Sequence, residues 1–235
     1  MDALSFYEKQ VYSQNGEDGM IEELFSRIGT TNQIFVEFGV SVGLECLTRN
    51  LLVHHGWSGL MIEADPQHFQ QLAVNFGHIL RVTLHHERVS RENIASIFRA
   101  NHIPTSFDFL SIDIDGNDYW VWQALSEWKP RVVVIEYNAS FPPPQKMVVV
   151  YDPNFSWDGT THFGASLTSL AGLGKQLGYA LIGTDTRGVN AFFIRRELLA
   201  ASGFEEQTPE QAYHPPSYGP VEGGHPRRIG PYLEI

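Results

Sequence analysis

Short apolar runs recur along the chain, and segments with helical spacing of their apolar residues lie between them. The runs are Ile34–Gly39, Gly59–Glu63, Leu80–Val89, Phe107–Ile112 and Arg131–Tyr137. The helical segments are Asp18–Ile28, Cys46–His55, Pro66–Phe76, Glu92–Asn101, Tyr119–Trp128 and Ser166–Leu177. Runs that are apolar throughout are typical of parallel strands buried on both faces. With an antiparallel pair expected at Tyr179–Gly183 and Asn190–Arg195, the alternation predicts an α/β fold. We expect a doubly wound, mostly parallel seven-stranded sheet with helices on both faces and an antiparallel last strand.

Composition narrows the domain organisation and the classes of partner. The chain has 235 residues, 43% of them hydrophobic, which suits one core. We expect a single domain over residues 1–204 and a Pro/Gly-rich tail over 205–235 that serves as a lid or an oligomer arm. The net charge of −11 disfavours nucleic acid and an anionic membrane as partners. Cys46 is the only cysteine, and no signal-peptide pattern is visible in the first ten residues, so a cytoplasmic location is expected.

Acidic residues and glycines at the ends of the first two predicted strands indicate a nucleoside site. Glu37 is followed by Gly39 and Gly43, and Glu63 ends the second strand. A carboxylate at that second position is suited to a ribose diol in doubly wound folds. The spacing E-x-G-x-x-x-G differs from the G-x-G-x-x-G of dinucleotide sites, and its acid would repel a pyrophosphate. The same acid favours the sulfonium and amino groups of S-adenosyl-L-methionine (SAM). An ordinary strand–helix turn remains the alternative for the glycines.

Three segments resemble class I SAM-dependent methyltransferases, and among these the FkbM-like methyltransferases. They are VEFG-x-x-x-G, GW-x-GLMIEADP and FDFLSIDIDG, and the Ser-Gln-x-Gly-Glu-Asp typical of that group is matched by residues 13–18. The resemblance covers roughly residues 11 to 198 and implies a Rossmann-like methyltransferase fold. It implies cofactor contacts from Gln14, Glu17, Glu37, Gly39, Val40, Ser41, Gly43, Glu63, Ala64, Asp65, Val89, Ser90 and Asp113.

The resemblance also implies a role for most of these positions. Residues 37, 39 and 43 would surround the methionine part of SAM, Glu63 would take the ribose hydroxyls, and Asp65 would lie beside the adenosine. Val89 and Ser90 would flank the adenine, while residues 14 and 17 would close over the cofactor. Many relatives carry an acid where this chain has Val42, so one contact is missing or is supplied by Glu45.

A dense group of acids follows the fourth predicted strand. Asp113, Asp115 and Asp118 lie within six positions, and Glu136 with Asn138 ends the next strand. In the methyltransferase fold Asp113 would face the transferable methyl group. Oxygen ligands of this kind suit Mg²⁺ or another divalent cation, for which we consider residues 113, 115, 136 and 138. The alternative is that residues 115 and 118 only cap the next helix.

Two look-alikes of this acidic motif are disfavoured. A haloacid-dehalogenase-type phosphatase places D-x-D-G after its first strand, whereas here the motif follows the fourth. An EF-hand requires glycine at position six and glutamate at position twelve, and counting from Asp113 this chain has Asp118 and Ala124 there.

The long segment after the fifth strand supplies further candidates. His162 would overhang the methyl side of the cofactor and serve as a base or metal ligand beside the catalytic candidates Asp113 and Asp115. Tyr137, Phe141, Tyr151 and Trp157 either line an acceptor pocket or simply pack. The favoured function is O-methylation of a hydroxyl on a sugar or natural product, with a small-molecule acceptor, a possible divalent cation and a possible homodimer. A non-catalytic SAM-fold regulatory protein and an NAD(P)-dependent oxidoreductase remain alternatives.

Overall fold

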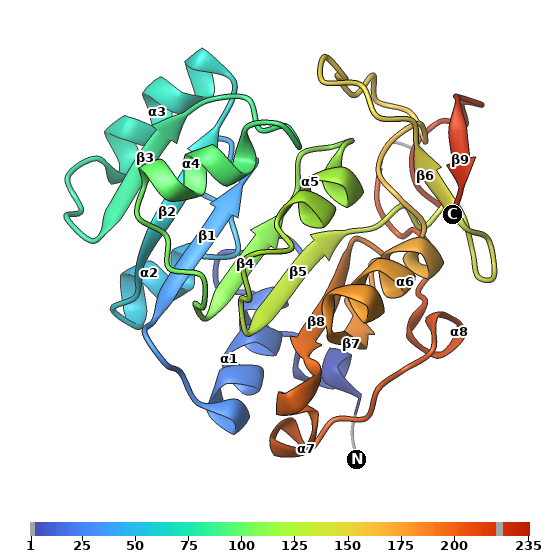
Figure 1. The fold of residues 1–235 in the computed structure, drawn as a ribbon, viewed down its shortest axis with the longest axis horizontal. Helices are drawn as coiled ribbons and strands as arrows, with labels where there is room; N and C mark the ends of the chain where they lie inside the picture. Colours follow the sequence, from blue (N-terminus) through green and yellow to red (C-terminus); the bar gives the residue numbers. More distant parts are fainter. Residues whose placement is uncertain (1–2, 220–222) are drawn as a thin grey trace.

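A seven-stranded sheet forms the centre of the computed structural model, which describes residues 3–219 and 223–235. The strand order is β3-β2-β1-β4-β5-β8-β7, and Figure 1 shows the strands side by side in this order. The strands are β1 (Ile34–Phe38), β2 (Ser58–Glu63), β3 (Val82–His86), β4 (Phe109–Ile112), β5 (Val132–Glu136), β7 (Tyr179–Thr184) and β8 (Asn190–Arg195). The predicted doubly wound sheet, including its antiparallel last strand, is confirmed.

The direction of the strands decides where a ligand can bind. Strands β1 to β5 are parallel, whereas β8 runs antiparallel to both β5 and β7. The chain leaves β3 at one side of β1 and returns as β4 at the other side, so the strand order reverses between β1 and β4. Open α/β sheets bind ligands beside the carboxyl ends of the strands at such a reversal.

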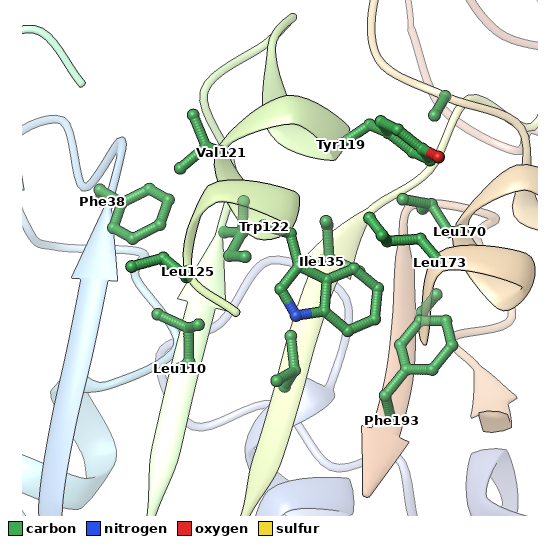
Figure 2. Close-up of a cluster of buried hydrophobic side chains, with 14 of the residues drawn as sticks. Phe38, Leu110, Tyr119, Val121, Trp122, Leu125, Ile135, Leu170, Leu173 and Phe193 are labelled. Atoms are coloured by element: carbon green, nitrogen blue, oxygen red, sulfur yellow. The ribbon is translucent and has the colours of Figure 1, made fainter. Parts of the chain in front are cut away.

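Helices cover both faces of the sheet, as expected for strands that are apolar throughout. They are α1 (Glu17–Ile28), α2 (Arg49–His54), α3 (Pro66–Phe76), α4 (Ile94–Ala100), α5 (Asp118–Ala124), α6 (Leu167–Leu177), α7 (Leu199–Ser202) and α8 (Pro209–Ala212), with 3₁₀ turns at Leu4–Tyr7 and Arg196–Leu198. One buried cluster joins the sheet to α4, α5 and α6, and the other joins it to α1, α2 and α3. Figure 2 shows Trp122 of α5 in the first cluster, with its ring centroid 4.9 Å from that of Phe193 in β8.

A buried ion pair fastens the sheet at the edge opposite the carboxyl ends. Asp108 is fully buried and accepts a hydrogen bond from the Arg131 guanidinium at 3.1 Å. Its carboxylate also accepts the backbone N–H groups of Thr31, Asn32 and Gln33 at 2.7–3.0 Å. Because these donors all converge on one charge, the loop between α1 and β1 is tied to the starts of β4 and β5.

Several elements are shorter than predicted. The third strand was expected to cover Leu80–Val89 but spans Val82–His86, since it pairs only with β2 and Leu80 is fully exposed. The second helix was expected from Cys46 but begins at Arg49, because the backbone just before it bonds to Glu37 instead.

The sequence patterns did not reveal a small second sheet. Within the expected loop after β5, β6 (Met147–Val149) pairs antiparallel with β9 (Tyr232–Glu234) of the tail. Figure 1 shows this pair beside α6, beyond the carboxyl end of β5. The end of the tail therefore packs against the segment that follows β5, whereas α8 earlier in the tail packs against β7 and α6. No helix of the described residues is both long and apolar enough to cross a membrane.

Candidate active site

Glu37 organises the loop that follows β1. Its carboxylate accepts the N–H groups of Leu47 and Thr48 at 2.8 and 2.9 Å and the Thr48 hydroxyl at 2.5 Å. Burial raises the pKa of Glu37, and these donors oppose the rise. Because a buried carboxylate requires such partners, the loop curves back across the carboxyl edge of the sheet.

Glu63, at the end of β2, ties the same loop to its neighbour. One carboxylate oxygen accepts the N–H of Ser41 at 2.7 Å, and the other accepts the N–H of Asp65 at 2.7 Å. Each oxygen retains a further acceptor site, so the carboxylate can still receive a diol. Asp65 itself caps α3 by accepting the N–H groups of Gln67 and His68 at 2.8 and 2.9 Å.

The two glycines after β1 have different roles. A Cβ on Gly39 would lie 1.6 Å from the carbonyl oxygen of Asp113, so this glycine allows the loop to touch the end of β4. A Cβ on Gly43 would instead lie 2.7 Å from Leu72 and 2.6 Å from Phe76 of α3. Gly43 therefore permits helix packing, and it does not line either cavity described next.

Two adjoining cavities lie along this edge of the sheet. The first, about 310 Å³, is lined by Gln14, Glu17, Glu37, Gly39, Val40, Ser41, Val42, Glu45, Ser111, Asp113, Asn190 and neighbouring residues. The second, about 340 Å³, is lined by Gly39, Ser41, Glu63, Ala64, His68, Glu87, Arg88, Val89, Asp113, Asp115, Phe155 and neighbours. Because Gly39, Ser41 and Asp113 belong to both, the cavities form two halves of one elongated site.

Most of the predicted cofactor residues meet in these cavities, and three do not line them. Gly43 packs under α3 and Asp65 caps it, whereas Ser90 exchanges hydrogen bonds with Asn93 at 2.7 and 3.2 Å. Sequence reasoning missed Ser111 and Asn190. Asn190 lies in β8 opposite Glu136, and its amide donates to Glu17 at 2.8 Å, a contact between segments far apart in the sequence.

A carboxylate cluster stands at the ends of β4 and β5. Oxygens of Asp113, Asp115 and Glu136 all lie within 4.8 Å of one another. Burial and repulsion among the acids raise the pKa of Asp113 and of Glu136 well above the usual range. The Oε2 atom of Glu136 is buried without a hydrogen-bond partner among the described residues.

Backbone geometry holds the cluster together. Asp115 has a positive φ of 54°, which is uncommon outside glycine and often marks a functional turn. Asp118 stabilises this turn by accepting the N–H groups of Ile114 and Gly116, both at 2.9 Å. Burial raises the pKa of Asp118 to about 6, although these donors oppose it. The side chain of Asp118 thus supports the turn, while Asp115 is exposed and lines the second cavity.

Two predicted site residues lie apart from the cluster. Asn138 is fully buried, donates to the carbonyls of Thr161 and Phe163 at 2.8 Å, and accepts the N–H of Ser140. His162 is buried against Phe155 and Tyr232, and its Nε2 has no hydrogen-bond partner in the described chain. Neither residue lines the two cavities.

Two residues of the tail that the sequence did not predict as site residues have shifted pKa values. Partial burial lowers the pKa of His225, and the charge of Asp115 opposes this effect. Burial raises the pKa of Tyr218, and the nearby charge of Glu136 adds to the rise. The His225 ring packs on Trp157 with centroids 4.6 Å apart. No pattern in the Pro/Gly-rich tail indicated this placement.

The methyltransferase FkbM domain matches residues 21–177 of the chain. Among solved structures, the citrinin polyketide synthase CMeT domain is 12% identical, with 77% of this chain and 51% of that chain covered and a TM-score of 0.50. The N-terminal domain of EvdMO1, in the presence of S-adenosylhomocysteine (SAH) and D-fucose, is 13% identical over 76% and 82% of the chains, with a TM-score of 0.49.

The glycopeptide N-methyltransferase MtfA, complexed with SAM, is 11% identical over 81% and 90% of the chains, with a TM-score of 0.45. At such identities a structural likeness bears on the fold alone. The comparison with curated protein sequences finds no match.

Proposed function

The chain belongs to the FkbM methyltransferase family and is a SAM-dependent methyltransferase, and from this premise we propose that it methylates a hydroxyl group of a small molecule. The methionine part of SAM would occupy the first cavity and the adenosine the second, with the ribose hydroxyls at Glu63. The acids that line both cavities support this placement, because SAM carries a sulfonium and an ammonium charge. The transferable methyl group would then lie near Asp113, which both cavities share.

The carboxylate cluster carries the proposal for the acceptor. A group of carboxylates stabilises the charged ammonium form of an amine, which has no electron pair free for attack. A hydroxyl is neutral and can donate its hydrogen to a carboxylate. The raised pKa of Asp113 and of Glu136 makes their ionised forms stronger proton acceptors.

The transfer itself is a single displacement. The acceptor oxygen forms a bond to the methyl carbon while the bond between that carbon and sulfur breaks, which leaves SAH as the other product. The hydroxyl proton passes to a carboxylate of the cluster. The protein contributes alignment of oxygen, carbon and sulfur and the exclusion of water, which together account for much of the rate in reactions of this kind. Since paired carboxylate oxygens suit neighbouring hydroxyls, we favour a sugar or a natural product with a diol as acceptor.

The decisive test combines cofactor binding with a comparison of acceptors. We expect SAH to bind in calorimetry and Asp113→Asn to reduce methyl transfer by about 10²–10⁴ while retaining folded structure. Glu210→Gln, an exposed change on α8, serves as the control. Products from polyols and from matching amino sugars would be located by mass spectrometry. Absence of SAH binding, or methyl groups found only on nitrogen, would refute the proposal.

The proposal also includes a divalent cation bound at the carboxylate cluster. The oxygens of Asp113, Asp115 and Glu136 provide ligands of the type that Mg²⁺ and Ca²⁺ prefer, and the unpartnered Oε2 of Glu136 fits such a ligand. A cation held there would lower the pKa of the acceptor hydroxyl. We expect Mg²⁺ to bind the SAH-saturated protein in calorimetry and Glu136→Gln to weaken that binding. Equal heats for both proteins would exclude this site.

Other expectations stay predictions. They are the role of His162 as a base, a lid function of the tail, the cytoplasmic location and the homodimer. The NAD(P)-dependent oxidoreductase predicts NADH binding, which the methyltransferase does not, so the same calorimetric assay distinguishes them.

A further inference from the structure

We infer that the acceptor binds in a third cavity, between the tail and the segment after β5, and that it carries an anionic group recognised by Arg227. This inference rests on the proposed function, because it names the class of compound that reaches the same methyl-transfer site. The acceptor class is a ring-bearing compound with a hydroxyl at one end and a carboxylate or phosphate at the other.

The third cavity has the size and the walls for such a compound. Its volume is about 720 Å³, the largest of the three described here. Phe141, Met147, Tyr213 and Tyr232 contribute apolar and aromatic surface. The hydroxyls of Tyr213 and Tyr232 are already bonded to the carbonyls of Ala139 and Thr161, each at 2.7 Å. These bonds fix the tyrosines and leave ring surface for packing against a ligand ring.

The charge of this cavity is opposite to that of the cofactor cavities. Among the residues that the structure describes, the ionisable side chains along its wall, apart from the tyrosines, are His225, Arg227 and Arg228, in a chain with 27 acidic and 16 basic residues. Arg228 is paired with Asp158. Arg227 is exposed and has no ion-pair partner among the described residues. Its guanidinium is therefore available for a carboxylate or a phosphate, which it can hold through two parallel hydrogen bonds.

His162 lies between the third cavity and the second. Its ring packs on Tyr232, which lines the third cavity, and on Phe155, which lines the second together with Asp113 and Asp115. Arg227 also lines the third cavity and is exposed to solvent. A ligand whose anion contacts Arg227 would extend from there along Tyr232 and His162 toward the second cavity, and its hydroxyl would reach the carboxylate cluster.

Matched pairs of probes test the inference on the SAH-saturated protein. The pairs are 3,4-dihydroxybenzoate with its amide, glucuronate with glucuronamide, and glucose 6-phosphate with glucose. In the first two pairs an amide replaces the carboxylate and removes its charge. In the third pair the whole phosphate group is absent from the neutral member. We expect the anionic member of at least one pair to bind roughly tenfold more tightly than its neutral partner in calorimetry. The pair with this affinity ratio identifies the preferred anion as a carboxylate or a phosphate.

Variants of the arginine complete the test. Arg227→Gln should bring the affinity ratio of the two members close to one, and Arg227→Lys should retain part of it. Arg99→Gln removes the same charge from α4, away from the cavity, and should leave the ratio unchanged. A ratio that persists in Arg227→Gln, or no preference for any anion in protein that binds SAH, overturns the inference but leaves the proposed function intact. Failure of SAH itself to bind refutes the proposed function instead.

Discussion

Replacing Gly39 by alanine tests whether contact between the loop after β1 and the end of β4 shapes the cofactor site. Gly39 has a φ of +79°, and an added Cβ would lie 1.6 Å from the Asp113 carbonyl oxygen and 2.8 Å from its carbonyl carbon. Both atoms belong to the backbone, so no side chain can rotate away. The loop and the end of β4 must separate, and Asp113 moves with them.

The size of the effect follows from two costs. Alanine in the left-handed region loses about 1–2 kcal/mol relative to glycine. Relief of the overlap adds about 1–3 kcal/mol, as for other overpacked sites. We therefore expect the free energy of unfolding to fall by about 2–5 kcal/mol and SAH binding to weaken by at least about tenfold, since both cavities share these residues.

A matched glycine separates the two costs. Gly178 ends α6 with a φ of +92°, and a Cβ there would meet no atom within 4 Å. Gly178→Ala should therefore lose only about 1–2 kcal/mol and keep the affinity for SAH. Unfolding would be followed in urea and SAH binding by calorimetry. Equal losses of stability in the two variants, with unchanged SAH affinity in Gly39→Ala, would refute the reasoning.

Two further predictions concern the framework of the site. Burial alone would raise the pKa of Asp108, but the backbone donors of residues 31–33 and Arg131 lower this pKa overall. The ionised carboxylate therefore stabilises the fold at pH values above the unfolded pKa of about 4, and this stabilisation is lost as the pH falls below that value. Urea midpoints between pH 6 and pH 3 should fall more in the parent than in Asp108→Asn; parallel curves would contradict this. Asn138→Ala removes the amide donor of the Phe163 carbonyl, whereas the Thr161 carbonyl keeps the Tyr232 hydroxyl, so we expect a loss of about 1–3 kcal/mol and faster proteolysis within residues 150–164, against unchanged cleavage elsewhere.

The strands of the main sheet could be predicted from local pattern. Apolar residues dominate Val132–Ile135 and Phe109–Ile112 because both faces of these strands are buried, and that requirement is visible residue by residue. The pairing of β6 with β9 could not be predicted in this way. Each strand is only three residues long, and its stability comes from a partner more than eighty positions away in the chain.

The residues of the site also fall into those that local sequence predicted and those that depend on tertiary contacts. Acids at the ends of predicted strands placed Glu37, Glu63 and Asp113 at one edge of the sheet, because the carboxyl ends of parallel strands meet at a common edge. The sequence by itself thus determined the fold and the acidic character of the edge at which the two cavities lie. Only the tertiary structure decided that Gly43 serves helix packing, that Asn190 reaches Glu17, and that His225 packs on Trp157. These contacts join segments whose separation along the chain leaves no local pattern, since they depend on how complete layers pack together.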